Sequence, residues 1–189
     1  MDQRLVIREL REPDIAAAQE VMRSVIEDSA EAYDPVIHAD VEDLRGSYLR
    51  RQGAFMLVVE DTTSGEVLAT GGLRNGAFDP DEVPPQLALL ERRYRDGGTG
   101  QVTRVHVLPQ HRRCGIARAL VEAIIDRARA EAQYVRLALH THPYSPGALT
   151  FWLAMGFQEV LDDMEASHQI FLELPLSTER NRPVLPGTA

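Results

Sequence analysis

Short apolar runs rich in β-branched residues alternate along the chain with longer segments whose apolar residues have helical spacing. The short runs predict strands, because their apolar positions are alternating or continuous over the length of an ordinary strand. Polar loops and turns that contain glycine or proline separate them. The predicted strands cover residues 5–8, 54–60, 67–73, 102–107, 134–141, 157–161 and 168–174.

Apolar residues three and four positions apart predict helices in the intervening segments. Asp40 is expected to cap the second of these helices, with Asp43 as an imperfect capping-box partner. Ser145 is expected to cap the last, with Pro146 at its first position. The predicted helices cover residues 13–28, 40–52, 117–132 and 146–155.

The order of these elements indicates one α+β domain over residues 1–175. The segment 176–189 is rich in proline, serine and threonine, which predicts a flexible tail. The pair Gly71-Gly72 inside the third strand indicates a β-bulge or the close approach of another group. Residues 74–99 form a long insertion with one candidate helix at 87–95, and such a length is typical of a functional or mobile connection.

Composition narrows the class of protein. A chain of 189 residues with 44% hydrophobic residues is typical of a globular domain. The net charge of −9 argues against general binding to nucleic acid or to anionic membranes. A single cysteine excludes an internal disulfide framework and a cysteine-rich zinc site. Neither a transmembrane run nor a signal-type apolar segment is present, so a cytoplasmic location is expected.

The turn between Pro109, which ends the fourth strand, and Ala117, near the next helix start, is a candidate anion site. The first N–H groups of a helix point outward and carry partial positive charge. Gly115 allows the backbone to approach a bound group, and Arg112 and Arg113 add charge suited to phosphate oxygens. The turn lacks GxxxxGK[ST] and GxGxxG, so it is neither a Walker loop nor a dinucleotide-binding turn.

Two blocks of sequence together resemble a known family. Residues 112–117, Arg-Arg-Cys-Gly-Ile-Ala, resemble the R/Q-x-x-G-x-G/A pyrophosphate-binding motif of the GNAT (Gcn5-related N-acetyltransferase) superfamily. Residues 148–157, Ala-Leu-Thr-Phe-Trp-Leu-Ala-Met-Gly-Phe, resemble the A-x-x-x-Y-x-x-x-G-F corner of the same family. The likeness covers roughly residues 4–175, with its specific motifs between 100 and 157.

The resemblance implies a mixed, mostly antiparallel sheet flanked by helices, splayed between its fourth and fifth strands. Acetyl-CoA would bind there as acyl donor, without a metal. The main chain of Val105 and Val107 would pair with the pantetheine arm, and the Val105 N–H would polarise the thioester carbonyl. Ser145 matches a position that often bonds this arm, although a helix cap is the alternative. Other implied contacts are Arg112, Arg113, Cys114, Gly115, Ile116, Ala117 and, as cleft wall or as core, Trp152.

The sequence departs from the family at two positions linked to proton transfer. Gln101 stands where many relatives have a glutamate base, and Trp152 matches the common tyrosine acid. His140 is the leading substitute base, because it lies near the end of the fifth strand and an unperturbed histidine titrates near neutrality. Leu137 and Leu139 are expected to face the core, which places His140 on the other face or at the splayed end.

Other interpretations of the histidines stay open. His140 is alternatively a structural residue bonded to a neighbouring loop, and His106 is the next candidate base. His111 and His142 are expected to be solvated loop residues. A zinc site built from His106, His140 and His142 has suitable ligand types but no support from their spacing.

The expected function is acetyl transfer to an amine of a small molecule or peptide. A CoA-binding sensor without turnover is the alternative, because the glutamate and tyrosine are missing. No nucleic-acid or membrane partner is expected, and a homodimer stays open. Contacts with the acceptor are expected from the connector at 29–40 and the insertion at 74–99. Several residues in or next to these segments suit contact with an amine, and solvated loop residues are the alternative interpretation. They are Asp28, Glu31, Tyr33, Asp34, Asp79, Asp81 and Glu82.

Overall fold

The computed structural model of the chain describes residues 5–29, 32–75, 94, 97–131, 133–142, 147–163 and 169–176. Several predicted features lie outside the described residues. They are Glu31, Asp79, Asp81, Glu82, Ser145, Pro146, the candidate helix at 87–95 except Tyr94, and the tail from residue 177 onward.

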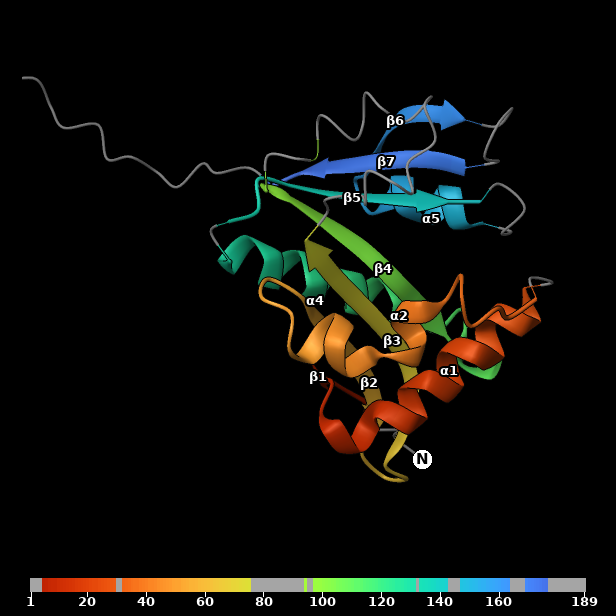
Figure 1. Cartoon of the computed structure of the whole chain (residues 1–189). Helices are drawn as coiled ribbons and strands as arrows, with labels where there is room; N and C mark the ends of the chain where they lie inside the picture. Colours follow the sequence, from red (N-terminus) through yellow and green to blue (C-terminus); the bar gives the residue numbers. More distant parts are fainter. Residues whose placement is uncertain are drawn as a thin grey trace, which may run out of the picture.

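Seven strands form one mixed sheet in the described part of the chain (Figure 1). Their order is β1-β2-β3-β4-β5-β7-β6, and every neighbouring pair is antiparallel except β4 and β5. The predicted strands and the α+β fold class are confirmed. The strands are β1 (Leu5–Glu9), β2 (Phe55–Asp61), β3 (Glu66–Asn75), β4 (Thr99–Val107), β5 (Arg136–Thr141), β6 (Gln158–Asp163) and β7 (Gln169–Pro175).

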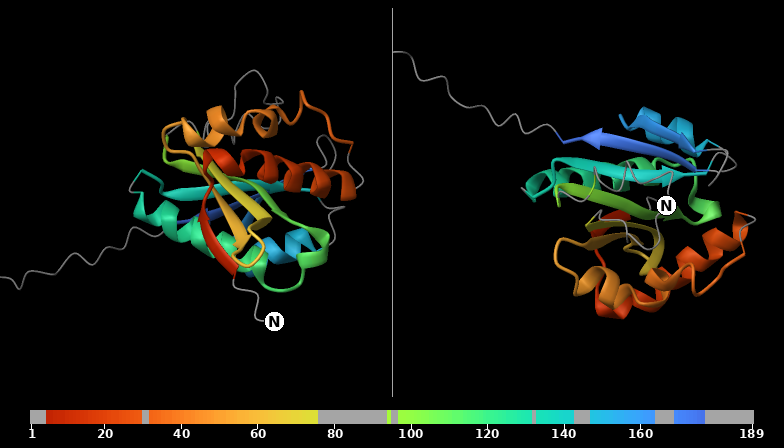
Figure 2. Two further views of the ribbon diagram at one scale, coloured as in Figure 1. Left: turned by 90° about the horizontal axis from the view of Figure 1, so that it is seen from below. Right: turned by 45° about the horizontal axis from the view of Figure 1, so that its top comes forward.

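Helices cover both faces of this sheet (Figure 2). The pair α4 and α5 packs on one face, and α1, α2 and η2 pack on the other face of the N-terminal strands. No helix among the described residues is long and apolar enough to cross a membrane. The helical elements are η1 (Glu12–Asp14), α1 (Ile15–Asp28), α2 (Ala39–Glu42), η2 (Arg45–Leu49), η4 (Pro109–His111), α4 (Ile116–Ala130) and α5 (Ala148–Ala154).

The main core lies between α4 and the sheet. Leu120 and Ile124 of α4 are fully buried against Leu137 and Leu139 of β5. Burial of each such side chain contributes about 1.5–3 kcal/mol to folding. Ala138 belongs instead to a small cluster on the opposite face. The alternation predicted for β5 is therefore confirmed, and its register positions the residues that follow Ala138.

The predicted helix over residues 40–52 is interrupted, and Asp40 is not its N-cap. Asp40 lies inside the short helix α2, and its carboxylate accepts two bonds from Arg104 of β4, at 3.0 and 2.5 Å. Asp43 accepts the N–H of Gly46 at 2.8 Å and so starts a separate helical turn. A long-range ion pair has replaced the local cap because it compensates a buried charge.

β4 contains a bulge at Arg104 and Val105, both of which oppose Gly71 of β3. Arg104 has a φ of 53°, a conformation that costs a non-glycine residue about 1–3 kcal/mol. A Cβ atom at Gly72 would lie 2.6 Å from a ring carbon of Tyr48. The two glycines therefore mark both a bulge and a close approach, the two alternatives that the sequence predicted.

Two predicted boundaries differ from the structure. α5 begins at Ala148, with Gly147 at φ 79° directly before it, so the helix starts later than the predicted cap at Ser145. Leu176 was assigned to the tail, but it is buried and donates its N–H to the carbonyl oxygen of Val135 at 2.9 Å. The folded domain therefore includes Leu176.

Candidate active site

β4 and β5 separate after three pairs of residues. Thr99–Gln101 pair with Arg136–Ala138, and beyond them β4 keeps only β3 as a neighbour. The N–H of Leu108 donates to the carbonyl oxygen of Leu68 in β3 at 3.1 Å. Because N–H groups alternate between the two sides of a strand, that of Val107 points away from β3. Val107 thus offers a main-chain donor on the side where β5 has diverged.

The bulge changes the orientation of the peptide between Arg104 and Val105, which comes before Val107 in β4. The Thr70 hydroxyl donates to the carbonyl oxygen of Arg104 at 3.0 Å, so a side chain holds this peptide. The carbonyl and N–H of one peptide point in opposite directions, so the N–H of Val105 points away from Thr70. The Val105 side chain packs against the main core. This residue is therefore suited to a main-chain role.

The turn between β4 and α4 has the backbone geometry of an anion site. Arg113 and Gly115 have φ values of 66° and 82°, and Gly115 directly precedes α4. A Cβ atom at Gly115 would have no heavy atom within 4 Å, so open space borders the turn. The first N–H groups of α4, which begin with buried Ile116, have no partner within the helix and carry partial positive charge. The geometry of the turn therefore suits an anionic group, as the sequence predicted.

The two arginines of the turn differ in their surroundings. The guanidinium of Arg112 donates to the carbonyl oxygen of Val107 at 3.1 Å and to the carboxylate of Asp28 at 2.8 Å. Arg112 therefore stabilises the turn from within. Arg113 and Cys114 are exposed, and Arg113 has no carboxylate partner within the described part of the chain. Arg112 is exposed as well, so both predicted phosphate contacts stay predictions, and Arg113 is the one that is not already paired with a carboxylate in the described part of the chain.

A buried polar cluster lies on the sheet face opposite α4. The Asp40 carboxylate accepts bonds from Arg104 and, at 3.0 Å, from the hydroxyl of Tyr48. The same hydroxyl lies 2.9 Å from Oγ1 of Thr103, and Nη1 of Arg74 lies 3.8 Å from Asp40. Burial raises the pKa of Asp40, but the ion pair with Arg104 outweighs it and holds that pKa below its usual value. Burial raises the pKa of Tyr48, which keeps its proton.

No local sequence signal identifies this cluster, because its bonded partners lie up to 64 residues apart. The only local sign was Asp40 at an expected helix start, which has an ordinary capping interpretation. The cluster joins α2 and η2 to β4 close to the bulge.

His140 lies on β5, two residues past the last residue that pairs with β4, on the face opposite α4. His140 as a whole residue is exposed, and its ring lies 5.9 Å from that of His142 and 5.8 Å from that of Phe171. The dense protein around it, and then the charges of His142, Arg104 and Arg74, lower the pKa of His140 to about 4. The expectation of titration near neutrality was therefore wrong, because these surroundings could not be inferred locally. His140 is neutral at physiological pH.

The other histidines are less suited to proton transfer at this site. The ring of His106 in β4 has a buried Nδ1 atom without a partner, and burial lowers the pKa of His106 to about 3. His111 ends η4, beside the anion turn. Within the described ranges, no three His, Cys, Asp or Glu side chains gather in a way that could hold a metal ion.

Trp152 belongs to the core. It is 9% exposed, and its ring packs edge-on against Phe151 at 5.0 Å and Phe157 at 5.3 Å. Of the two predicted interpretations, the structure favours core over cleft wall.

Trp152→Phe is therefore expected to lower the free energy of unfolding by about 1–2 kcal/mol, because it removes buried ring atoms. Turnover should change by no more than about threefold, since the indole transfers no proton. Urea denaturation and kcat measure the two effects, with Leu153→Ala, at an exposed position of the same helix, as control. A hundredfold loss of kcat in a stably folded Trp152→Phe protein would contradict this assignment.

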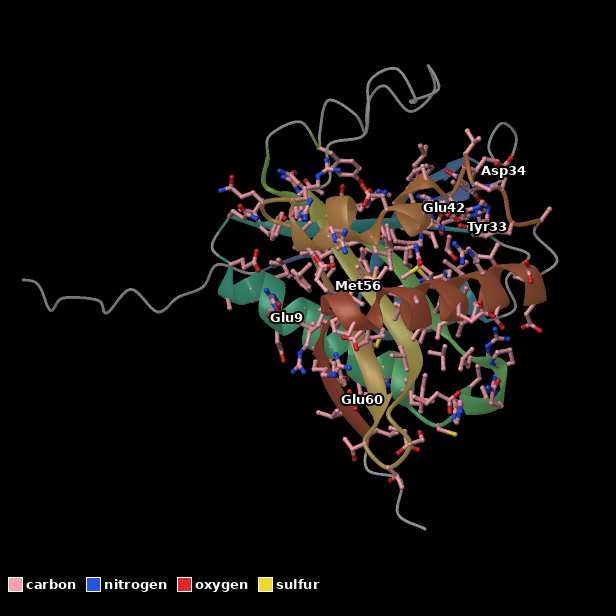
Figure 3. All side chains as sticks on the ribbon, turned by 60° about the horizontal axis from the view of Figure 1, so that its bottom comes forward. Glu9, Tyr33, Asp34, Glu42, Met56 and Glu60 are labelled. Atoms are coloured by element: carbon pink, nitrogen blue, oxygen red, sulfur yellow. The ribbon has the colours of Figure 1, made fainter. Side chains whose placement is uncertain are left out.

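The described residues among those expected to contact an amine bond to other parts of the protein. Asp28 pairs with Arg112, and Asp34 accepts the N–H of Val36 at 2.8 Å. The Tyr33 hydroxyl donates to the carboxylate of Glu42, the last residue of α2, and Figure 3 shows Tyr33 and Asp34 of the preceding connector near Glu42. Contact of these residues with an acceptor stays a prediction.

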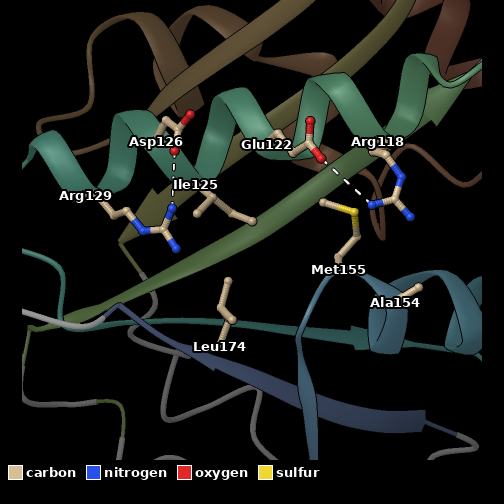
Figure 4. A pocket seen from close by; sticks show the side chains of 8 residues that line it. All are labelled: Arg118, Glu122, Ile125, Asp126, Arg129, Ala154, Met155 and Leu174. Carbon is tan, nitrogen blue, oxygen red and sulfur yellow. Dashed lines mark hydrogen bonds and ion pairs between the residues drawn. The ribbon is translucent and has the colours of Figure 1, made fainter.

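A separate open groove lies between α4 and the C-terminal strands (Figure 4). The pairs Arg118–Glu122, at 3.8 Å, and Arg129–Asp126, at 3.2 Å, follow its rim along α4. None of the predicted site residues contributes to it. It is lined by Arg118, Glu122, Ile125, Asp126, Arg129, Ala154, Met155 and Leu174.

Comparisons with known proteins agree with this geometry. The model of the Acetyltransferase (GNAT) family matches residues 20–157. N-acetyltransferase 8 of Rattus norvegicus is 32% identical over 123 residues, which are 65% of this chain and 48% of that protein. The chain thus spans about half the length of the curated relatives it matches.

Solved structures show the same fold at low sequence identity. A GNAT-family acetyltransferase from Staphylococcus aureus Mu50 has a TM-score of 0.72 at 17% identity, covering 92% of this chain and 100% of that one. The PaiA N-acetyltransferase from Thermoplasma acidophilum, in complex with coenzyme A, has a TM-score of 0.67 at 14% identity, covering 91% and 99%. The family match includes the strand separation, the anion turn and α5. The chain therefore belongs to the GNAT acetyltransferase family.

Proposed function

We propose that the protein is an N-acetyltransferase that moves an acetyl group from acetyl-CoA directly to the amine of a small molecule or peptide in a ternary complex. One observation carries this proposal. The main-chain edge of β4 that β5 leaves free leads directly into the open, positively polarised turn before α4. Acetyl-CoA has a thioester at one end of a long arm and a pyrophosphate at the other, so it matches a free strand edge followed by an anion site.

Backbone groups hold the donor in this proposal. The N–H groups from Arg113 to Ala117 bind the pyrophosphate, and the exposed Arg113 side chain adds positive charge. The N–H of Val107 bonds to the pantetheine arm. The N–H of Val105 polarises the thioester carbonyl as an oxyanion donor. Ser145 keeps its predicted contact with the arm as a proposal.

The reaction then needs one bond to form and one to break. The acceptor nitrogen attacks the carbonyl carbon, a C–N bond forms, and the C–S bond breaks with its electron pair on sulfur. The proton of the attacking amine passes to a base. The CoA thiolate is a stable leaving group in water, so the buried Trp152 does not need to supply an acid.

His140 is the proposed base, acting directly or through one water molecule. It lies past the separation of β4 and β5, and it is neutral and exposed. A base with a lowered pKa is weak, but the amine proton becomes acidic once nitrogen bonds the carbonyl carbon. Proton transfer at that stage suits such a group.

His140→Ala is expected to lower kcat/KM by about 10²-fold, as is typical for loss of a general base. Protonation of His140 stops it accepting a proton, so wild-type activity should be lost as pH falls through its pKa of about 4. That acid limb should disappear in His140→Ala. His111→Ala, in η4, is the matched control and should keep the wild-type pH profile. Unchanged activity and pH dependence in His140→Ala would show that His140 is structural.

The alternative function, a CoA-binding sensor, predicts binding without turnover. Release of free thiol from acetyl-CoA, measured with a panel of amines, separates the two. A transferase releases thiol only when an acceptor is present. A sensor is stabilised by acetyl-CoA but releases none with any amine.

A further inference from the structure

Two arginines lie close together on the sheet face opposite α4, next to the point where β4 and β5 separate. Arg74 lies near the end of β3, opposite Gln101 of β4, and Arg104 forms the bulge of β4. Both side chains are mostly buried, with exposed fractions of 26% and 19%. Both lie close enough to His140 to affect its protonation.

One carboxylate, Asp40, lies between these two cations, and Arg104 occupies it. Nε and Nη2 of Arg104 donate to the two oxygens of Asp40, at 3.0 and 2.5 Å. Nη1 of Arg74 is 3.8 Å from Asp40, beyond hydrogen-bond distance. Asp40 also accepts the hydroxyl proton of Tyr48. The hydrogen bonds to this carboxylate therefore come from groups other than Arg74, which contributes only a longer ion pair.

Arg74 is left with weak contacts among the described residues. Its Nη2 donates to the amide oxygen of Gln101 at 3.4 Å, near the upper limit for a hydrogen bond. Its Nε atom is buried and bonds to nothing. An arginine has five N–H donors, and leaving a buried donor unmade costs free energy. A guanidinium in this state is suited to binding an anion that arrives with a ligand.

The remaining charges on this face leave a positive excess around Arg74. Arg136 of β5 and Glu173 of β7 are diagonal neighbours on the same face, so their opposite charges offset each other. Among the described residues, His140 and His142 lie together at the end of the neighbouring strand. The lowered pKa of His140 has the charges of His142, Arg104 and Arg74 among its causes, which agrees with a positive local field.

A positive field disfavours an ammonium group and favours the neutral amine that acetyl transfer requires. It also attracts an acceptor with a negative group near the reacting nitrogen. We propose that the acceptor is an amine that bears a carboxylate, as α-amino acids do, and that the guanidinium of Arg74 binds this carboxylate. Planar guanidinium and carboxylate groups match through two parallel hydrogen bonds. This inference depends on the acetyl transfer proposed above and names its acceptor class.

The test compares α-amino acids with their carboxamides, which lack the negative charge, and expresses kcat/KM per neutral amine because the carboxamide also lowers the pKa of the amine. Wild-type kcat/KM in the thiol-release assay should favour the acids by about 10- to 100-fold, the range for a hydrogen bond to a charged group. Arg74→Gln should lose this preference because its kcat/KM for the acids falls. Its kcat/KM for the carboxamides should stay near the wild-type value. Arg74→Lys should keep part of it. Arg129→Gln, which removes an exposed arginine of α4, is the matched control and should keep all of it.

Binding of the reaction product provides a second readout that does not need turnover. N-acetyl amino acids should raise the melting temperature of wild type more than their carboxamides do, and Arg74→Gln should abolish the difference. Stabilisation by CoA, which does not involve Arg74, shows that each variant is folded.

Two failures are distinguishable. If wild type acetylates carboxamides as fast as acids, or if Arg74→Gln keeps the preference, the carboxylate site is wrong and acetyl transfer stands. If no acceptor of either kind releases thiol, the proposed function fails. In that case, an equal shift by N-acetyl amino acids and their carboxamides would overturn the carboxylate site as well.

Discussion

Gly115→Asp is expected to abolish the stabilisation of the protein by CoA. CoA should raise the melting temperature of wild type by mass action, because it binds only the folded state. The substitution places a carboxylate at the start of α4, where the proposed pyrophosphate site lies. Like charges then compete for the same N–H groups. At millimolar CoA, the melting temperature of Gly115→Asp should not move.

The fold itself should survive this change. A Cβ atom at Gly115 meets no heavy atom within 4 Å, so the side chain has room. The φ of 82° costs a non-glycine residue about 1–2 kcal/mol, which a favourable acidic cap partly offsets. Gly115→Asn has nearly the same shape without charge, and asparagine tolerates this conformation. CoA should still raise the melting temperature of Gly115→Asn, but by less than it does for wild type. If both variants lose this rise equally, shape rather than charge decides binding.

Asp40→Ala is expected to lower the free energy of unfolding by about 3–5 kcal/mol, because it leaves the buried guanidinium of Arg104 without its partner. It also removes the acceptor of the Tyr48 hydroxyl. Urea denaturation at neutral pH measures the loss. The double variant Asp40→Ala/Arg104→Met should lose less than the sum of its single variants, since Arg104 is removed together with its partner. Additive losses would show that the ion pair is not coupled in this way.

The same pair makes a pH-dependent contribution. The pKa of Asp40 is lower in the folded protein than in the unfolded chain, where an aspartate titrates near about 3.9. Its stabilising effect is therefore present above that pH and is lost as pH falls through the folded-state pKa. Asp40→Ala should accordingly differ most from wild type near neutral pH and least in strong acid.

The elements that the sequence predicted well are those set by local patterns. The alternation of Leu137, Ala138 and Leu139 was enough to assign the faces of β5, and Gly115 was enough to mark the turn before α4. The break after α2 was not predicted, and neither was the pairing of Asp40 with Arg104 of β4. A capping residue and a buried ion-pair residue have the same local sequence, and only the fold distinguishes them.

The candidate site was predictable in its backbone and less so in its side chains. Main-chain roles for Val105 and Val107 were implied by the family resemblance, and the structure supplies the bulge and strand separation that favour them. The lowered pKa of His140 depends first on burial and then on the charges of His142, Arg104 and Arg74, the last two of which come from other strands. Arg112 was expected at the phosphate, but its partners are Val107 and a distant carboxylate. Such contacts join residues far apart in the sequence and have no local signature.

The central claim is that this chain transfers an acetyl group, and the most direct test follows that group. The protein is incubated with acetyl-CoA labelled in the acetyl group and with a panel of amines that includes α-amino acids. Mass spectrometry then measures label on each amine, and a thiol reagent measures free CoA. The account predicts labelled amine and free CoA in equal amounts, both absent when the amine is omitted. Protein that is saturated with acetyl-CoA and yet labels no amine would contradict it.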